Sequence, residues 1–282
     1  LVNLDCCRSY VLVVCQLLLR LPVFACWIRS HTRACRVSGT CPVCSLADVV
    51  AVLGSNDARM PGVSASSEPF GLVHQRALCG AAFVVCSEQD AVVFLQCFLE
   101  TSRQCEIGQG RVALDCESLS DHVVTPVDRT CAFAVETRSR CSGCRIGCSS
   151  RSVESLLRLR VRDEPGDVVL VSESYLRWCS PRKESDPCSR ADCAARGSDV
   201  FSQRRMATLP SVLFVHVDRV RVPGLPQLSR MRVCLEEQFN VPMLGVMELA
   251  AVVCHTGKAL SSGHYTCVCR GPNGMFYRFD DK

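Results

Sequence analysis

A histidine and an aspartate near the C-terminal end of the sequence, His264 and Asp280, could form half of a catalytic site. Two short runs of β-branched, aromatic and sulfur-containing residues, 265–270 and 275–279, flank the segment 271–274, whose Asn-Gly pair is a strong hairpin signal. Because the midpoint between the two residues falls inside this turn, we expect them to be neighbours at the open end of the hairpin. An imidazole beside a carboxylate is a general base with its orienting partner, so the nucleophile must come from elsewhere in the chain.

Four cysteines in the middle of the chain have the spacing of metal ligands. Two pairs of closely spaced thiolates can enclose a zinc ion tetrahedrally, and a structural site needs four such ligands and no open position. The sequence therefore predicts a structural zinc ion bound by Cys141, Cys144, Cys188 and Cys193. Cys148 and Cys179 lie close enough in the sequence to substitute for one of these ligands. The pair Cys41 and Cys44 is interpreted as a chance match in a cysteine-rich chain.

Two further polar sites have structural interpretations. Asp90 opens an apolar run predicted as a helix over 90–99, and a carboxylate there is favoured by the helix dipole. His216 and Arg219 lie near the end of an alternating run over 209–220, where they are interpreted as structural polar residues of a strand.

The elements that must position these residues change in type along the chain. Residues 1 to about 105 predict helices joined by a cysteine-containing connection, and the Gly, Ser and Pro content of 54–69 predicts an exposed loop. From about residue 120 onward, short β-rich segments follow, namely 122–127, 131–139, 154–163, 167–176, 211–220 and the closing hairpin. Helices first and strands later predict an α+β fold.

The composition is that of a globular protein with ample length for a hydrophobic core. Of its 282 residues, 48% are hydrophobic and 21% are charged, and the net charge of +4 is small. Basic and aromatic residues do not interleave, which argues against a nucleic-acid partner. The 23 cysteines are an odd number, and many lie in apolar runs where a thiol acts as a small hydrophobe. We therefore expect a reducing cytoplasmic or nuclear location, with a secreted cysteine-rich protein as the alternative.

The apolar run near the N-terminal end resembles a membrane segment only superficially. Gln16, Arg20 and Pro22 interrupt it, so it lacks the roughly 18 clean apolar residues of a membrane span. We expect a buried helix that stops before Pro22 and no membrane partner, with a signal sequence ending near Ala25 as the alternative. Because the chain opens on Leu1 rather than Met, we expect a fragment truncated at both ends.

Taken together, these stretches resemble the catalytic domain of the ubiquitin-specific proteases, the papain-like cysteine deubiquitinases. The segment "YVLVVCQLLLRLP" resembles the Cys box of the family, "EQDAVVFLQCFLE" its Gln-Gln-Asp helix, and "LPSVLFVHVDRV" its Leu-Pro strand. The closing segment from "ELAAVVCHTG" to "GMFYRFDD" resembles the His box closely, and the cysteine pairs match the zinc-bearing fingers. The resemblance implies one catalytic domain over 1–282, with a helical thumb over about 1–120 and β-rich fingers and palm over about 121–282.

The resemblance also implies roles for individual residues. His264 matches the general base, and Asp280 matches the residue that orients it. Asn3 matches the residue that stabilises the oxyanion of the tetrahedral intermediate. The residues that match the substrate-binding positions of the family are Asp90, His255, Gly263 and Tyr265.

The nucleophile is the position at which this sequence departs from the family. The stretch from Asn3 to Gln16 is one residue longer than in the family pattern, and counting back from Gln16 places Ser9 at the nucleophile position. Cys7 is the nearby thiol, but choosing it requires two extra residues in the helix, which turns the downstream face by about 200°. Geometry therefore favours Ser9, whereas chemistry favours Cys7, because a thiol ionises far more readily than a hydroxyl.

Two functions follow from the resemblance. The first is a thiol-dependent isopeptidase that removes ubiquitin or a ubiquitin-like modifier from lysine side chains of target proteins, without a cofactor for catalysis. The compact length is most similar to the short interferon-induced member of the family, which acts on a ubiquitin-like modifier. The alternative is a catalytically inactive member that binds the modifier or another partner through the same cleft.

Overall fold

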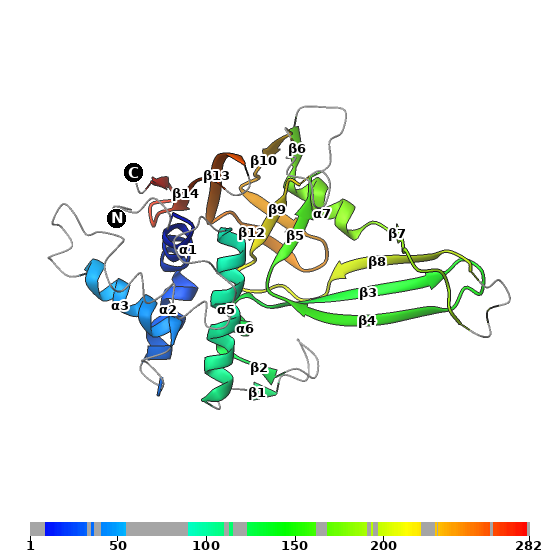
Figure 1. Cartoon of the computed structure of the whole chain (residues 1–282), viewed down its shortest axis with the longest axis horizontal. Helices are drawn as coiled ribbons and strands as arrows, with labels where there is room; N and C mark the ends of the chain where they lie inside the picture. The colour runs from blue at the N-terminus through cyan, green and yellow to red at the C-terminus, as the bar shows by residue number, and fades with distance from the viewer. Residues whose placement is uncertain are drawn as a thin grey trace. The chain divides into compact units, whose positions relative to one another are not determined.

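The chain forms two compact units that do not follow the order of the sequence. The computed structural model describes residues 9–32, 35–36, 41–54, 90–109, 113–114, 123–161, 168–190, 193, 197–220, 229, 231–259 and 262–280. Unit 1 combines residues 1–113 and 124–130 with 249–282, and unit 2 contains 114–123 and 131–248 (Figure 1). The N-terminal helices and the C-terminal hairpin therefore share one unit, although the sequence separates them by more than half of the chain.

Unit 1 contains most of the helices that the structure describes. Their bounds are α1 Ser9–Arg20, α2 Pro22–Thr32, α3 Pro42–Gly54, α5 Ala91–Gly108 and α6 Pro126–Cys131. Proline is the first residue of α2, α3 and α6, a position where its fixed φ suits the helix and its missing N–H costs no hydrogen bond. The helix predicted over 90–99 is longer than expected, and the loop expected at 54–69 lies, apart from Gly54, outside the described residues.

Helix α1 is the buried helix that the sequence predicts. It ends at Arg20, directly before the break at Leu21 and Pro22, and it is buried on nearly every side. Within the part of the chain that the structure describes, no single helix has the length and hydropathy of a membrane span; α1 and α2 reach them only jointly, across a bend of 93°.

The hairpin predicted at the C-terminal end belongs to a three-stranded antiparallel sheet of order β13-β14-β15. The strands are β13 Ala251–Ala259, β14 Ser262–Arg270 and β15 Phe276–Phe279. The turn is closed by a 2.7 Å hydrogen bond from the Gly271 amide to the Met275 carbonyl, and Gly274 has a φ of 79°, which favours glycine. Helix α1 packs against β13 and β14, and its Arg20 guanidinium lies 4.8 Å from the ring centroid of Phe279.

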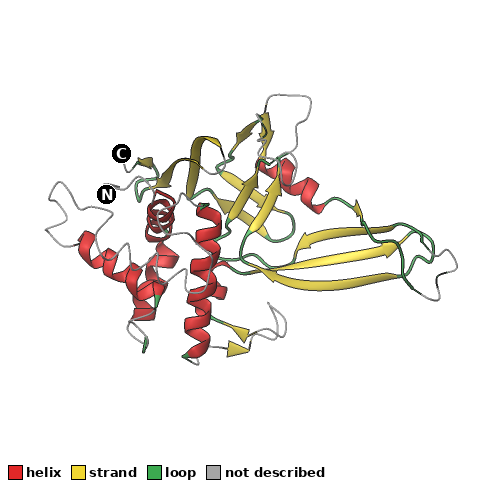
Figure 2. Ribbon diagram, viewed as in Figure 1, coloured by secondary structure: helices red, strands yellow, loops and turns green. Residues whose placement is uncertain are grey.

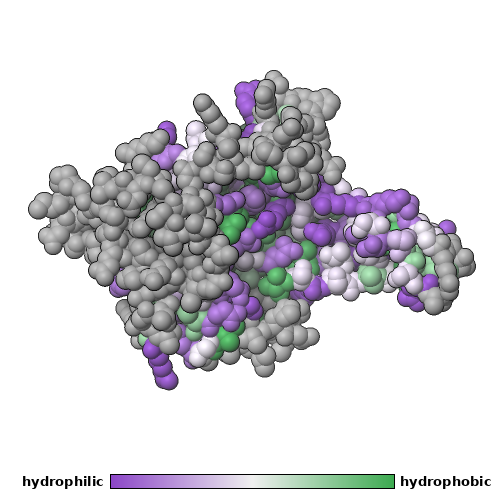
Figure 3. Space-filling model, in the orientation of Figure 1, coloured by the Kyte–Doolittle hydropathy of each residue, from purple (hydrophilic) through white to green (hydrophobic). Residues whose placement is uncertain are grey.

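Unit 2 is built mainly from strands (Figure 2). Its largest sheet has the order β4-β3-β8-β7, with antiparallel neighbours. The bounds are β3 Phe133–Cys141, β4 Gly147–Glu154, β7 Arg182–Lys183 and β8 Val200–Met206. Strand β4 is exposed over most of its length, and Figure 3 shows mostly hydrophilic and weakly polar side chains over this sheet.

Shorter elements complete the fold. Strands β5 Leu157–Arg160 and β9 Val215–Asp218 pair in parallel, as do β6 Val168–Leu170 and β10 Arg232–Cys234. Strands β11 Gln238–Val241 and β12 Gly245–Glu248 form an antiparallel pair, and β1 Ala113–Leu114 pairs with β2 Val123–Val124. Among the described residues, the largest buried cluster of unit 2 consists of Phe133, Val135, Leu157, Leu159, Tyr175, Trp178, Met206 and Val241.

Two strand predictions are wrong over part of their length. The segment 167–176 is strand only as far as Leu170, after which helix α7 runs over Val171–Cys179. Val171, Tyr175 and Trp178 follow the helical spacing i, i+4, i+7 and pack into the core, which outweighs the β-propensity of the valines. The segment 122–127 is likewise strand only at β2, because Pro126 begins α6.

We expect Leu157→Ala to lower the free energy of unfolding by about 2–5 kcal/mol, because the side chain is fully buried in the core of unit 2. Leu176→Ala is the matched control, since Leu176 of α7 is 56% exposed and its truncation should change this free energy by less than about 0.5 kcal/mol. Urea unfolding followed by tryptophan fluorescence measures both. Equal losses in the two variants would contradict the core described above.

Candidate active site

The imidazole of His264 and the carboxylate of Asp280 are hydrogen-bonded, with 2.7 Å between Nε2 and Oδ1. The observed register pairs Cys267 with Phe279, so the hairpin is centred one position after the midpoint of His264 and Asp280 that the sequence predicts. Continuing that register would set Asp280 opposite Thr266, with His264 as its diagonal neighbour on the same face of the sheet. The two side chains meet on this diagonal rather than directly across the strands.

The geometry of this pair suits a general base. The side chains of His264 and Asp280 are 17% and 32% exposed, so the bond is partly shielded from water. The Arg278 guanidinium holds the second carboxylate oxygen of Asp280 at 3.0 Å. Because Nε2 bonds the carboxylate, Nδ1 is the ring nitrogen that can exchange a proton with a nucleophile.

Two contacts of helix α5 connect this hairpin to the first turn of α1. The ring of Tyr10 meets the ring of Phe94 edge to face, with 5.7 Å between the centroids. At the start of the same helix, the Ala91 amide donates a 3.4 Å hydrogen bond to the Tyr265 hydroxyl. Tyr10 follows Ser9 and Tyr265 follows His264, so α5 holds both parts of the candidate site in one packed arrangement.

Of the two nucleophile candidates, only Ser9 belongs to the described residues. It is the first residue of α1 and is 3% exposed. Cys7 and Asn3 lie outside the described residues. Cys15 is a thiol of α1, but burial raises its pKa to about 12, so it is unsuited to nucleophilic attack.

Asp90 occupies the cap position at the N-terminus of α5. Its Oδ1 accepts a 2.7 Å hydrogen bond from the Val92 amide, one of the four amides that a helix leaves unsatisfied at its start. The structural role expected from the helix dipole is therefore present. The side chain is also exposed, so the carboxylate can still meet a charged ligand.

His255 lies directly over Gly263, across strands β13 and β14. The rings of His255 and Tyr265 are cross-strand neighbours with centroids 4.6 Å apart. A methyl group at Gly263 would overlap the His255 ring and approach the Thr256 carbonyl oxygen to 2.8 Å. Glycine is thus required next to His264, because the imidazole of His255 occupies the space that a side chain would need.

The four cysteines predicted as zinc ligands come together in unit 2. The sulfur atoms of Cys141, Cys144, Cys188 and Cys193 all lie within 4.8 Å of one another. Amide hydrogen bonds from Cys144 and Gly143 lower the pKa of the Cys141 thiol to about 7, which favours the thiolate that a metal requires. Neither Cys148, which is exposed, nor Cys179 belongs to this group. The donor set therefore fits a structural zinc ion.

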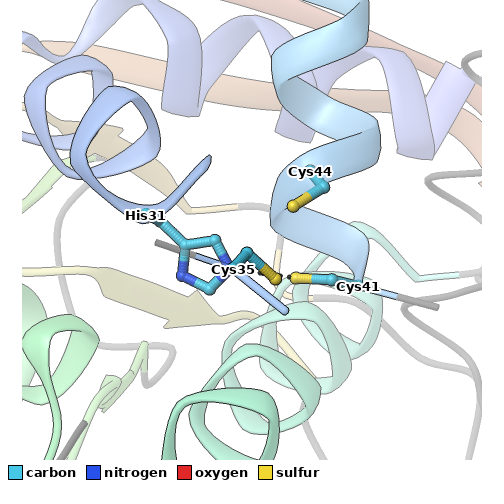
Figure 4. Close-up of side chains that lie close together, drawn as sticks. All are labelled: His31, Cys35, Cys41 and Cys44. Atoms are coloured by element: carbon cyan, nitrogen blue, oxygen red, sulfur yellow. Dashed lines mark hydrogen bonds between the residues drawn. The ribbon is translucent and has the colours of Figure 1, made fainter. Parts of the chain in front are cut away.

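Cys41 and Cys44, interpreted from the sequence as a chance pair, are not isolated in the structure. Together with His31 and Cys35 they form a second group whose ligand atoms lie within 4.8 Å of one another (Figure 4). The signal in the sequence was the spacing His-x3-Cys-x5-Cys-x2-Cys, which begins with a histidine rather than with a second cysteine pair.

A comparison with known protein families leads to the same family as the fold and the His264–Asp280 geometry. The family model described as ubiquitin carboxyl-terminal hydrolase matches residues 1–282. The chain belongs to this family. Ubiquitin carboxyl-terminal hydrolase 23 of Arabidopsis thaliana is 22% identical over 261 residues, which are 89% of this chain and 29% of the relative. Probable ubiquitin carboxyl-terminal hydrolase 16 of Schizosaccharomyces pombe is 25% identical over 279 residues, which are 95% of this chain and 58% of the relative.

Solved structures of the family share the fold of this member. The SAGA Ubp8/Sgf11/Sus1/Sgf73 module bound to ubiquitin aldehyde contains a chain with a TM-score of 0.80 and 19% identity, covering 100% of this chain and 64% of that one. The same module bound to monoubiquitin gives a TM-score of 0.79 at 19% identity, covering 100% and 63%. The α+β fold of the ubiquitin-specific protease type predicted from the sequence is confirmed. This family member spans less than two thirds of each relative.

Replacing Asp90 tests its role as a helix cap. We expect Asp90→Ala to lower the free energy of unfolding by about 0.5–2 kcal/mol, because the Val92 amide loses its acceptor. Asp90→Asn should be nearly neutral, since asparagine caps a helix about as well and differs mainly in charge. Urea unfolding of both variants measures the difference, and an equal loss in both would show that the charge rather than the cap stabilises α5.

Proposed function

We propose that this chain is the catalytic domain of a thiol-dependent isopeptidase that removes ubiquitin from lysine side chains of target proteins. The observation that carries the proposal is the 2.7 Å bond between His264 and Asp280 in a chain that belongs to the ubiquitin carboxyl-terminal hydrolase family. Related structures bound to monoubiquitin and to ubiquitin aldehyde support ubiquitin as the modifier. A ubiquitin-like modifier, expected from the similarity to the interferon-induced member, is the variant of this proposal.

In the proposed reaction, Nδ1 of His264 removes the proton of a cysteine thiol, and the thiolate attacks the isopeptide carbonyl carbon. The carbon–nitrogen bond then breaks, and the imidazolium returns its proton to the departing lysine amine. Water, deprotonated by the same imidazole, then attacks the thioester carbon. The carbon–sulfur bond breaks, the sulfur takes the proton back from the imidazolium, and the modifier leaves with a free carboxylate. Asp280 stabilises the imidazolium, and Asn3 would stabilise the oxyanion.

We propose Cys7 as the nucleophile. It precedes the first residue of α1 by two positions in the sequence, and a thiol ionises far more readily than the hydroxyl of a serine. Ser9 is a poor candidate because it is 3% exposed and its hydroxyl is far less acidic.

The alternative is an inactive member that binds the modifier or another partner without cleaving it. Ser9 favours this alternative, because it occupies the position that matches the family nucleophile and is buried in the first turn of α1. The same substrate-binding residues would then serve binding alone.

The proposed substrate contacts use residues around the hairpin and the start of α5. The exposed carboxylate of Asp90 suits a basic C-terminal tail of the modifier. Gly263 and Tyr265 flank His264 on β14, and His255 faces Tyr265 from β13, so we propose that the tail binds along these residues. A cytoplasmic or nuclear location is part of the proposal, because buried thiols such as Cys15 contribute to the core as free cysteines.

Ubiquitin that carries a C-terminal electrophile separates the two functions. We expect one covalent adduct, abolished by Cys7→Ala and slowed about 10²- to 10⁴-fold by His264→Ala, which removes the general base. Denaturing gel electrophoresis and intact mass measure the adduct.

Cys6→Ala and Ser9→Ala are the matched controls and should leave the adduct unchanged. Loss of the adduct in Ser9→Ala alone would identify the serine as the nucleophile. Measurable ubiquitin binding without any adduct would overturn the isopeptidase and establish the binding function.

We also propose that the cysteine group of unit 2 binds a structural zinc ion. Cys141→Ser should release one zinc ion per chain and lower the stability of unit 2, because the metal links β3 to the segment that carries Cys188 and Cys193. Cys148→Ser is the control, since Cys148 is an exposed cysteine of neighbouring β4. Elemental analysis of the purified proteins measures the zinc, and retention in Cys141→Ser would refute this site.

A further inference from the structure

A second cluster of metal-binding side chains lies in unit 1 and shares no residue with the cysteine group of unit 2. We propose that it holds a structural zinc ion, with an imidazole and three thiolates as ligands. These ligands are His31, Cys35, Cys41 and Cys44. The proposal concerns the stability of the helical region and does not depend on the reaction that the chain performs.

The four ligand atoms have the spacing of a tetrahedral site. They lie within 4.8 Å of one another, and Nε2 of His31 is 3.1 Å from the sulfur of Cys41. Zinc–sulfur and zinc–nitrogen bonds of about 2.3 and 2.0 Å place tetrahedral ligand atoms roughly 3.5–4 Å apart. Figure 4 shows the four side chains converging from the end of α2, the connection after it and the start of α3. Small side-chain adjustments would therefore suffice to enclose an ion.

The backbone around Cys41 repeats a feature of the cysteine group in unit 2. Cys41 directly precedes α3, and the amide of Cys44 donates a hydrogen bond to its sulfur. In unit 2, the amide of Cys144 donates in the same way to the sulfur of Cys141. Each Cys-x-x-Cys pair thus presents two sulfurs on one tight turn, which is the arrangement that a tetrahedral metal site needs.

Buried Glu106 orients the histidine for metal binding. Its carboxylate is fully buried, and Oε1 accepts hydrogen bonds from the indole N–H of Trp27 at 2.8 Å and from Nδ1 of His31 at 3.3 Å. Oε2 accepts a 3.1 Å bond from the Val127 amide at the start of α6. A proton on Nδ1 leaves the lone pair of Nε2 directed at the thiols, which is how a carboxylate prepares a histidine ligand.

Gln109, the residue that caps the end of α5, supports the remaining ligand. The side-chain amide of Gln109 donates to the sulfur of Cys35 at 3.5 Å, and its oxygen accepts from the Arg36 amide at 3.4 Å. Residues 35 and 36, which lie between α2 and α3, are therefore held against the end of α5. A metal bound here would link the end of α2 to the start of α3, next to the end of α5 that supplies Glu106 and Gln109.

The donor set selects zinc. Three soft thiolates and one imidazole suit zinc rather than magnesium or calcium, which prefer oxygen ligands. Three of the four ligands are buried and Cys35 is half-buried, so no position is left for water or substrate, as in structural sites. A disulfide would use only two of the three thiols. It would not explain why Glu106 orients Nε2 of His31 toward these thiols.

Zinc stoichiometry tests the proposal. We expect two zinc ions per chain by elemental analysis, one of them lost in Cys41→Ser. Cys26→Ser is the matched control, because Cys26 is an exposed cysteine of α2 outside the cluster. A chain with one zinc ion that is retained in Cys41→Ser and released in Cys141→Ser overturns the proposal.

Cobalt binding keeps the test decisive if Cys41→Ser fails to fold. In the Cys141→Ser background, one equivalent of Co²⁺ should produce the thiolate charge-transfer and visible bands of a tetrahedral site. Absence of these bands overturns the proposal. In the same background, Glu106→Gln should weaken zinc affinity about 10- to 100-fold in a chelator competition, whereas Glu100→Gln on the exposed face of α5 should not change it. Equal affinities in the two variants would refute the role assigned to Glu106.

Discussion

The packing of helix α1 against the C-terminal sheet is the constraint on which the candidate active site depends. The helix is apolar on nearly every side, so it is stable only when it is surrounded, and β13, β14 and α5 surround it. Burying such a helix fixes it against β14, the strand that carries His264, and packs its Tyr10 against Phe94 of α5. Helix α1 and the strand that carries the proposed general base are thereby held together by a hydrophobic requirement rather than by attraction between catalytic groups.

The main effect of the polar interactions around this core is to orient side chains, and their contribution to the stability of the fold is smaller. Exposed hydrogen bonds and ion pairs contribute little free energy, but they select one orientation among several. The Asp280 carboxylate selects a tautomer of His264, and the Tyr265 hydroxyl holds the start of α5. Glu106 likewise orients the ring of His31, and it does so where both side chains are fully buried and an unpaired carboxylate would be costly. In each case the acidic or hydroxyl group prepares a neighbour for its chemistry.

The two groups of metal-binding side chains show how a chain with so many cysteines can use them. Some thiols, such as Cys15, fill the core as small apolar groups. Others converge in groups with the geometry of metal ligands, one in each compact unit. With a metal bound, each group would join segments that hydrophobic contact alone would hold more loosely: the tips of strands in unit 2 and the ends of helices in unit 1. Neither group includes His264 or Asp280, so the candidate catalytic pair and the metal ligands are separate sets of residues.

Features encoded within one turn or one hairpin could be read directly from the residues. The Asn-Gly turn, the pairing of His264 with Asp280, the end of α1 before Pro22 and the proximity of Cys141 to Cys144 all follow from short-range geometry. The predicted register of the hairpin was wrong by one position. The residues of a turn show where a hairpin lies, but they do not fix which residues of its two strands are paired.

Features that join distant segments depended on packing. His31 and Glu106 are 75 residues apart, and nothing in the local pattern of either indicates that their side chains share a hydrogen bond. Helix α7 replaced an expected strand because the core of unit 2 accommodates a helical face at Val171, Tyr175 and Trp178. Periodicity describes one element at a time, whereas the approach of α5 that lets Glu106 orient His31 is a property of the whole core.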